Sequence, residues 1–243
     1  MGVVLVVPGS STASCEVQFL RSLLPVRSDD ANPLIRATTD APSLAVALGN
    51  ALAFLPARSL IPYVAIRVNA SGVFTCGTDS YAAGTDVAPV TGYIGDATEV
   101  VALVDKEGLT ALEKAAREAK KVTATIEIKD GLVTVSPMGM QPGSAVNHQE
   151  GADRFTELHS AVWEIIDAAE RRKNVLPPGV MLDPTLFGRF SKVKADKSER
   201  KADLLFAEGH EPVLIKIGPT FKGLIMPVDR EVNSRELGQD GLW

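Results

Sequence analysis

The spacing of apolar residues changes along the chain, and each change predicts a structural element. From Ser43 to Leu55 apolar side chains recur every three or four residues, as on the buried stripe of a helix, at Leu44, Leu48, Leu52 and Leu55. We take Ser43 as the N-cap of this helix. Pro56 and Pro62 follow, and proline ends a helix because it lacks the amide donor.

The period then becomes two, which predicts strands. Val64, Ile66 and Val68 alternate with other residues, and the turn formers of 69–72 lead into a second apolar run, 73–76. A strand from Pro33 to Thr39 is predicted before the helix. The same order returns later, with a strand at 100–104, a helix from Glu107 to Lys121, and strands at 122–128 and 132–135 around Asp130-Gly131. Helices packed on antiparallel sheets, an α+β fold, are expected.

The pattern after a Gly/Pro-containing connector at 138–147 is different. Apolar residues at helical spacing predict a helix with an inward stripe formed by Phe155, Leu158, Val162, Ile165, Ile166 and Ala169. Asp183-Pro184 reads as an N-cap followed by proline at the first helical position, with Leu186, Phe187 and Phe190 directed inward. Two strands, 212–217 and 221–228, follow.

The order "LxxALxxALxFLPxRxxIPxxxIxVxxxGxFTxxTDSY" resembles the repeating unit of bacterial DNA sliding clamps, the beta clamps, in which a hairpin closes on a "TDxxR" corner. Here the corner is Thr78-Asp79-Ser80-Tyr81, and Ala82 takes the position of the arginine. Met226-Pro227-Val228 is similar to the end of the last clamp strand. The resemblance implies a DNA-clamp fold of two domains: 1–147 with an added N-terminal segment, and a shortened 148–228. A tail, 229–243, follows.

Composition and motifs give no sign of an enzyme. The 243 residues are 45% hydrophobic and 23% charged, as in a soluble globular protein. Phosphate-binding loops, dinucleotide-binding glycine motifs and nucleophile elbows are absent from the sequence. The two cysteines and three histidines have no metal-ligand spacing, so we expect neither metal nor cofactor. Val3 to Val7 is too short for a signal peptide or a membrane span, and a cytoplasmic protein is expected.

The predicted second helix has one apolar and one basic face. Leu109 and Leu112 fall on the first face, whereas Lys114, Arg117 and Lys121 fall on the opposite one. Such a stripe can simply be solvated, because Glu113 and Glu118 flank it and can pair with its cations. The resemblance implies instead that it faces double-stranded DNA, together with the basic residues Arg189, Lys192 and Lys194. Contacts to phosphate alone would be independent of sequence.

The resemblance also implies protein partners and an assembly. DNA polymerase and other clamp-binding proteins would dock a peptide in a hydrophobic groove lined by Ile66, Thr78, Tyr81, Ala83, Ile225, Met226, Pro227 and Val228. Protomers would close into a homo-oligomeric ring around DNA and raise the processivity of a polymerase. If six domains complete the ring, two domains per chain favour a trimer, with a dimer as the other possibility.

The tail leaves an alternative open. Gln239, Leu242 and Trp243 are spaced like the Gln-x-x-Leu-aromatic peptide by which partners bind beta clamps. The protein could therefore be an adaptor that binds another clamp, or a clamp whose tail occupies its own groove. A clamp-derived scaffold that does not encircle DNA is a further possibility.

Overall fold

The computed structural model describes residues 35–228 except for short gaps at 56–59, 96, 121, 149–151, 178 and 208–210. These residues belong to one compact unit, 31–243. The apolar run Val3 to Val7, Cys15, Lys121 and the tail with Gln239, Leu242 and Trp243 lie outside the described residues. No helix of the described part is long and apolar enough to cross a membrane.

Three repeats of similar design account for most of the described chain. The first repeat, 35–95, contains β1 (Ile35–Asp40), α1 (Ala41–Leu52), β2 (Tyr63–Asn69), β3 (Gly72–Thr78) and β4 (Ala82–Gly95). The second repeat, 99–148, contains β5 (Glu99–Asp105), α2 (Lys106–Glu118), β6 (Thr123–Lys129), β7 (Leu132–Pro137) and β8 (Gly143–Val146). The third repeat, 180–228, contains α4 (Pro184–Phe187), the 3-10 helix η1 (Gly188–Lys192), β9 (Ala202–Leu205), β10 (Val213–Ile217) and β11 (Phe221–Ile225).

Each repeat begins its helix with the same cap. The side chains of Asp40, Asp105 and Asp183 precede α1, α2 and α4 and accept hydrogen bonds from backbone amides of the first turn. Three antiparallel strands then follow each helix. The segment before the helix pairs with the end of the last strand of its own repeat: β1 with β4, Leu103 with His148, and Met181 with Val228.

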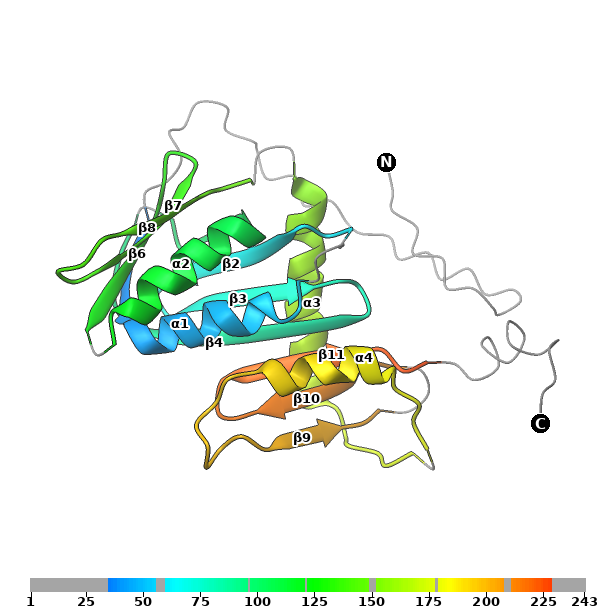
Figure 1. The fold of residues 1–243 in the computed structure, drawn as a ribbon. Coiled ribbons are helices and arrows are strands. Elements are labelled where there is room, and N and C mark those ends of the chain that lie inside the picture. Colours follow the sequence, from blue (N-terminus) through cyan, green and yellow to red (C-terminus); the bar gives the residue numbers. More distant parts are fainter. Residues whose placement is uncertain are drawn as a thin grey trace. The chain divides into compact units, whose positions relative to one another are not determined.

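The first two repeats complete each other. β1 pairs with β6 of the second repeat, and β5 pairs with β2 of the first. Helices α1 and α2 lie side by side on one face of the strands (Figure 1). Their apolar sides share one core with the inward residues of the strands, including Leu44, Leu48, Leu109, Leu112 and Ile126. The third repeat joins this body through β11, which pairs with β4 in the register Ile225↔Ala82 and Leu224↔Ala83.

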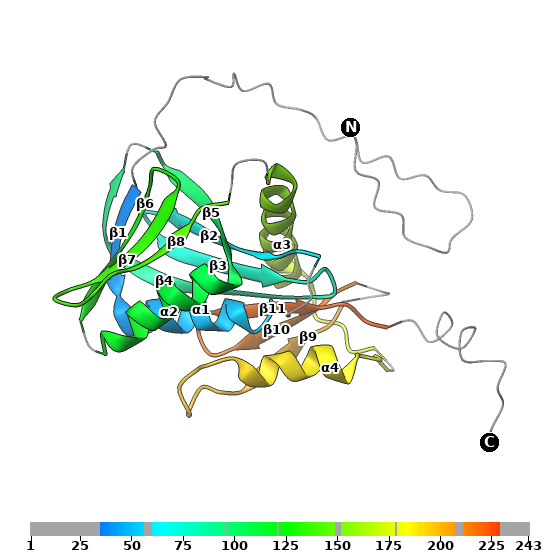
Figure 2. The ribbon, with the colours of Figure 1, turned by 45° about the horizontal axis from the view of Figure 1, so that its top comes forward.

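Helix α3 (Asp153–Arg171) packs on the opposite face of the strands from α1 and α2 (Figure 2). In β2, Val64 and Ile66 belong to the core under α1 and α2, whereas Ala65 points the other way and packs with Val162 and Ile166 of α3. The Arg67 guanidinium lies 4.2 Å from the Trp163 ring of α3. At the far end of α3, Glu170 pairs with Lys216 of β10 and Lys222 of β11 at 2.6 and 2.5 Å.

Several element predictions are confirmed and several need correction. The helices at α1 and α2, the hairpins at 69–72 and 130–131, and the Asp183-Pro184 start are present. Asp40, not Ser43, caps α1, and the Ser43 amide donates to the Asp40 carboxylate. The connector 138–147 contains β8, and β9 lies at 202–205, where the sequence predicts no strand. Phe187 and Ile165, predicted to point inward, are 40% and 38% exposed.

Candidate nucleic-acid interface

Helix α2 has two different faces: its apolar residues pack into the core, and its basic residues lie on the opposite, exposed side. Leu109, Leu112 and Ala116 are fully buried. The side chains of Lys114 and Arg117, on the other side of the helix, are 68% and 63% exposed. This is the division that the helical period predicts, and it leaves both cations in contact with solvent.

Two carboxylates accompany these cations. Glu118 Oε1 lies 4.0 Å from Lys114 Nζ, and Glu113 Oε2 lies 3.7 Å from Arg117 Nη2. Glu118 is exposed like its partner, so this pair contributes little to stability. Glu113 differs, because only 7% of its side chain is exposed. It is a buried anion held beneath the basic face.

Lys194 of the third repeat joins the basic face at Glu113. Its Nζ lies 3.1 Å from Glu113 Oε1, and its side chain remains 51% exposed. The backbone of Lys194 is fixed to α1, since its amide donates to Asn50 Oδ1 at 2.7 Å and its carbonyl accepts from Asn50 Nδ2 at 3.1 Å. Lys114, Arg117 and Lys194 therefore form one basic patch, which we call the helix-face patch.

Asn50 also connects this patch to a buried carboxylate. Its Nδ2 donates to Asp86 Oδ2 at 2.7 Å. Burial raises the pKa of the Asp86 carboxyl, although hydrogen bonds from Thr220, Asn50 and the Val87 amide partly offset this effect. Asp86 and Lys194 both line a pocket of about 490 Å³ between the start of α1 and the third repeat.

The other residues predicted to contact DNA are placed differently. Lys192 is exposed on η1. Arg189 is largely covered: its Nη1 lies 2.6 Å from Asp79 Oδ2, and the two side chains are only 15% and 11% exposed. Arg189 thus offers little surface to a phosphate backbone. Lys121 lies outside the described residues.

The predicted peptide groove maps to a corner where three segments meet. The turn 79–82 is closed by Asp79 Oδ1, which accepts from the amides of Tyr81 and Ala82 at 3.0 and 2.9 Å. The segment 226–228, after β11, runs beside this turn, and the Met226 amide donates to the Tyr81 carbonyl at 2.9 Å. The Val228 amide then donates to the Met181 carbonyl at 2.8 Å.

Only part of the predicted groove is at the surface of this corner. Tyr81 is 64% exposed and Met226 38%, and Pro227 and Val228 are partly exposed. Thr78, Ala83 and Ile225 are buried beneath them. Ile66 is fully buried in the core under α1 and α2, so it contributes no surface to a groove.

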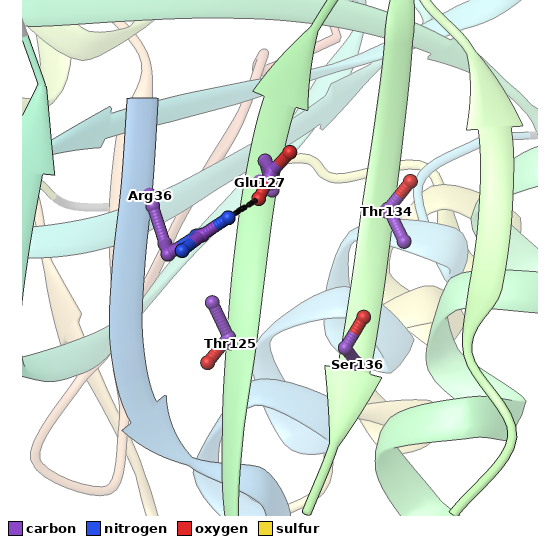
Figure 3. A pocket seen from close by; sticks show the side chains of 5 residues that line it. All are labelled: Arg36, Thr125, Glu127, Thr134 and Ser136. Carbon is purple, nitrogen blue, oxygen red and sulfur yellow. Dashed lines mark hydrogen bonds and ion pairs between the residues drawn. The ribbon is translucent and has the colours of Figure 1, made fainter. Parts of the chain in front are cut away.

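A second pocket, of about 320 Å³, is polar and lies on the strands. Figure 3 shows Arg36 of β1 reaching across to Glu127 of β6, with Nε and Nη2 donating to Glu127 Oε2 at 2.8 and 2.5 Å. Thr125, Thr134 and Ser136 complete the lining. The Arg36 cation is thus paired with a carboxylate within this pocket.

Comparison with solved structures identifies the architecture. The DNA polymerase III beta subunit of Thermotoga maritima matches with a TM-score of 0.59 and 12% sequence identity, over 80% of this chain. The chain has the fold of a bacterial sliding clamp. The beta clamp of Helicobacter pylori bound to a DNA ligase peptide matches with a TM-score of 0.56 and 11% sequence identity, over 84% of this chain. The sliding clamp of Pseudomonas aeruginosa matches with a TM-score of 0.57 and 9% sequence identity, over 85% of this chain.

The likeness is one of fold and not of sequence. No protein-family model matches the chain, and no curated protein matches it by sequence. The match spans 65% of the Thermotoga protein, less than two thirds of its length, and 68% and 70% of the Helicobacter and Pseudomonas clamps. This chain thus corresponds to about two thirds of the length of a clamp subunit.

Two features of the interface were missed from the sequence. The helical pattern predicts that Glu113 flanks the basic stripe, whereas it is the buried anion beneath Arg117 and Lys194. The resemblance implies that Arg189 contacts DNA, whereas it pairs with Asp79 of the turn. A signal for the second existed: the corner retains Asp79 but has Ala82 where the related motif has arginine, which leaves the carboxylate in need of another cation.

Proposed function

We propose that this protein is a DNA sliding clamp, a processivity factor that encircles duplex DNA as a homo-oligomeric ring in the cytoplasm. The observation that carries the proposal is the helix-face patch on a clamp fold. Lys114 and Arg117 of α2 and Lys194 of the third repeat are exposed on the helix side of the strands. In the proposal, 1–147 and 148–228 are two clamp-like domains, the second one shortened.

The helix-face patch suits contact with a phosphate backbone. Lysine and arginine bind phosphate irrespective of base sequence, and such contacts weaken as salt rises. The chain as a whole has a formal net charge of -5, so cations gathered on one face give the molecule a preferred side for DNA. Binding of this kind permits sliding and requires no chemistry on the DNA.

The corner formed by the turn 79–82 and the segment 226–228 is the proposed docking site for partner peptides. Tyr81 and Met226 supply its exposed apolar surface, and Pro227 and Val228 extend it. The Helicobacter clamp of the same fold is described as bound to a DNA ligase peptide. Polymerases and other clamp-binding proteins are the partners that we propose for this chain.

Salt-dependent binding to duplex DNA tests the proposed contact. The double variant Lys114→Gln/Arg117→Gln removes two cations and keeps both side chains polar. If each cation contacts one phosphate, the slope of log K against log[salt] becomes shallower by about 0.9 per contact. A matched control, Lys129→Gln/Arg154→Gln, removes two cations outside the helix-face patch and should leave the slope unchanged. Equal slopes for both variants would exclude the patch as the DNA contact.

A further inference from the structure

The third repeat lacks the partner that the first two repeats provide for each other. β2 of the first repeat has β3 on one side and β5 of the second repeat on the other. β6 likewise lies between β7 and β1. The corresponding strand of the third repeat, β9, is paired with β10 alone among the described strands. A fourth repeat would supply its second neighbour, and the described residues contain none.

The free edge of β9 is covered at one end only. The Val175 amide donates to the Phe206 carbonyl at 3.2 Å, and the Phe206 amide donates to Asn174 Oδ1 at 2.9 Å, so Phe206 faces the outer edge. Because outward-facing backbone groups alternate along a strand, Leu204 and Ala202 face the same edge. Unpaired edge groups are a template for adding another strand.

The helix of the third repeat shows the same incompleteness. Phe187 is the fourth residue after the capping Asp183, the position that Leu44 occupies after Asp40 and Leu109 after Asp105. Leu44 and Leu109 are fully buried in a core to which both of the first two repeats contribute. Phe187 is 40% exposed. The third repeat thus exposes a large apolar side chain at the position where the paired repeats bury theirs.

We infer that the third repeats of two copies of this chain pair about a two-fold axis and complete one domain, as the first and second repeats do within the chain. The segment 180–183 of each copy adds to the β9 edge of the other, and the two Phe187 side chains enter a shared core. A second copy of the chain is the partner that we propose. It supplies both the segment 180–183, which can pair with β9, and Phe187, which can fill the shared core.

The first two repeats also give the register of this pairing. Within the chain, the capping aspartate of one repeat lies opposite the first residue of the partner repeat's second strand, in the registers Asp105↔Tyr63 and Asp40↔Thr123. The same register brings Asp183 to the start of β9 in the other copy, where the exposed Lys201 precedes Ala202. Asp183 then lies opposite Ala202, whose neighbours Lys201 and Asp203 carry opposite charges, so this register brings no net repulsion.

The inference concerns self-assembly and can be tested without DNA, so it stands or falls independently of the proposed DNA binding. Light scattering on the full chain should give twice the 25.8 kDa chain mass, or a higher even multiple. In Phe187→Asp the buried charge should raise the dissociation constant of the pair by about 30-fold or more, the effect of losing a binding hot spot. Ile94→Asp, at an exposed apolar residue of β4, is the matched control and should not change the mass.

Hydrogen exchange separates loss of pairing from loss of folding. The outward-facing amides of Ala202 and Leu204 should be protected at high protein concentration in the natural chain and exposed in Phe187→Asp, while amides of β2 and β3 keep their protection in both. A monomer at every concentration, a trimer, or a dimer that survives Phe187→Asp with unprotected β9 amides would each overturn the inference.

Discussion

The guanidinium of Arg189 lies 2.6 Å from the carboxylate of Asp79, although 110 positions separate them along the chain (189 − 79). Asp79 uses its other oxygen to accept from the Tyr81 and Ala82 amides. One carboxylate therefore holds the turn 79–82 and also attaches it to the third repeat. The cation that this corner lacks at position 82 is supplied by a different repeat.

Removing this cation should loosen the third repeat. In Arg189→Met the Asp79 carboxylate stays mostly buried without its cation, and we expect a loss of about 1–3 kcal/mol in the free energy of unfolding, the range for a buried polar group that loses its partner. Urea unfolding measures the loss. Lys192→Met, a change at an exposed neighbouring residue, should cost less than about 0.5 kcal/mol. Equal effects of the two changes would contradict a structural role for Arg189.

Glu170 predicts a pH-dependent attachment of α3. Burial alone would raise the pKa of the Glu170 carboxyl, but hydrogen bonds and charge from Lys216 and Lys222 outweigh burial and lower it. The stabilisation is therefore present above the unfolded pKa, near 4.5, and is lost as the pH falls through the lower folded value. Glu170→Gln should cost about 1 kcal/mol at pH 7. That difference should shrink below pH 4.5, and a cost that does not change with pH would contradict this account.

His159 predicts a second pH dependence, at higher pH. Its ring is fully buried, with Nδ1 2.6 Å from the Phe155 carbonyl oxygen, and burial lowers its pKa from 6.5 although hydrogen bonds to the Phe155 and Tyr63 backbones oppose the shift. The unfolded chain then binds the proton more readily, so stability should fall as the pH drops below 6.5. Comparing thermal unfolding of the natural chain and His159→Phe from pH 7.5 to 5.5 tests this. Parallel pH profiles would contradict it.

The tail gives a prediction about the proposed docking corner. If the tail segment with Gln239, Leu242 and Trp243 occupies the corner, deleting 239–243 should increase the affinity for a polymerase-derived peptide of the Gln-x-x-Leu-aromatic type. Met226→Asp, which places a charge in the corner, should abolish peptide binding with or without the tail. Fluorescence anisotropy of a labelled peptide measures both. Unchanged affinity after the deletion would exclude the hypothesis that the tail occupies the docking corner.

How much the sequence could predict depended on how local the signal was. The face of α2, its Asp105 cap and the Asp130-Gly131 hairpin follow from residues a few positions apart, and all three are present. β8 and β9 were missed because each has only four residues, and glycine, serine, alanine and aspartate weaken the strand signal. The position of α3, opposite α1 and α2, could not be predicted from its row of apolar residues. A helical period shows which side of a helix is buried but not which surface it packs against.

For the candidate site, too, local features were predictable from the sequence and contacts between distant segments were not. Lys114 and Arg117 were predicted because both lie on one helix, and their exposure agrees with that placement. The pairing of Lys194 with Glu113 and the burial of Arg189 depend on contacts between distant repeats, which no spacing in the sequence encodes.

The most direct test of the proposed clamp is topological. The protein is assembled on nicked circular DNA at low salt, the salt is raised to dissociate simple electrostatic binding, and a single-site restriction enzyme then opens the circle. An encircling ring should stay on the intact circle and leave after cutting, as measured by co-elution with the DNA in gel filtration. Release from intact circles at the raised salt, or equal retention on circular and linear DNA, would contradict encirclement.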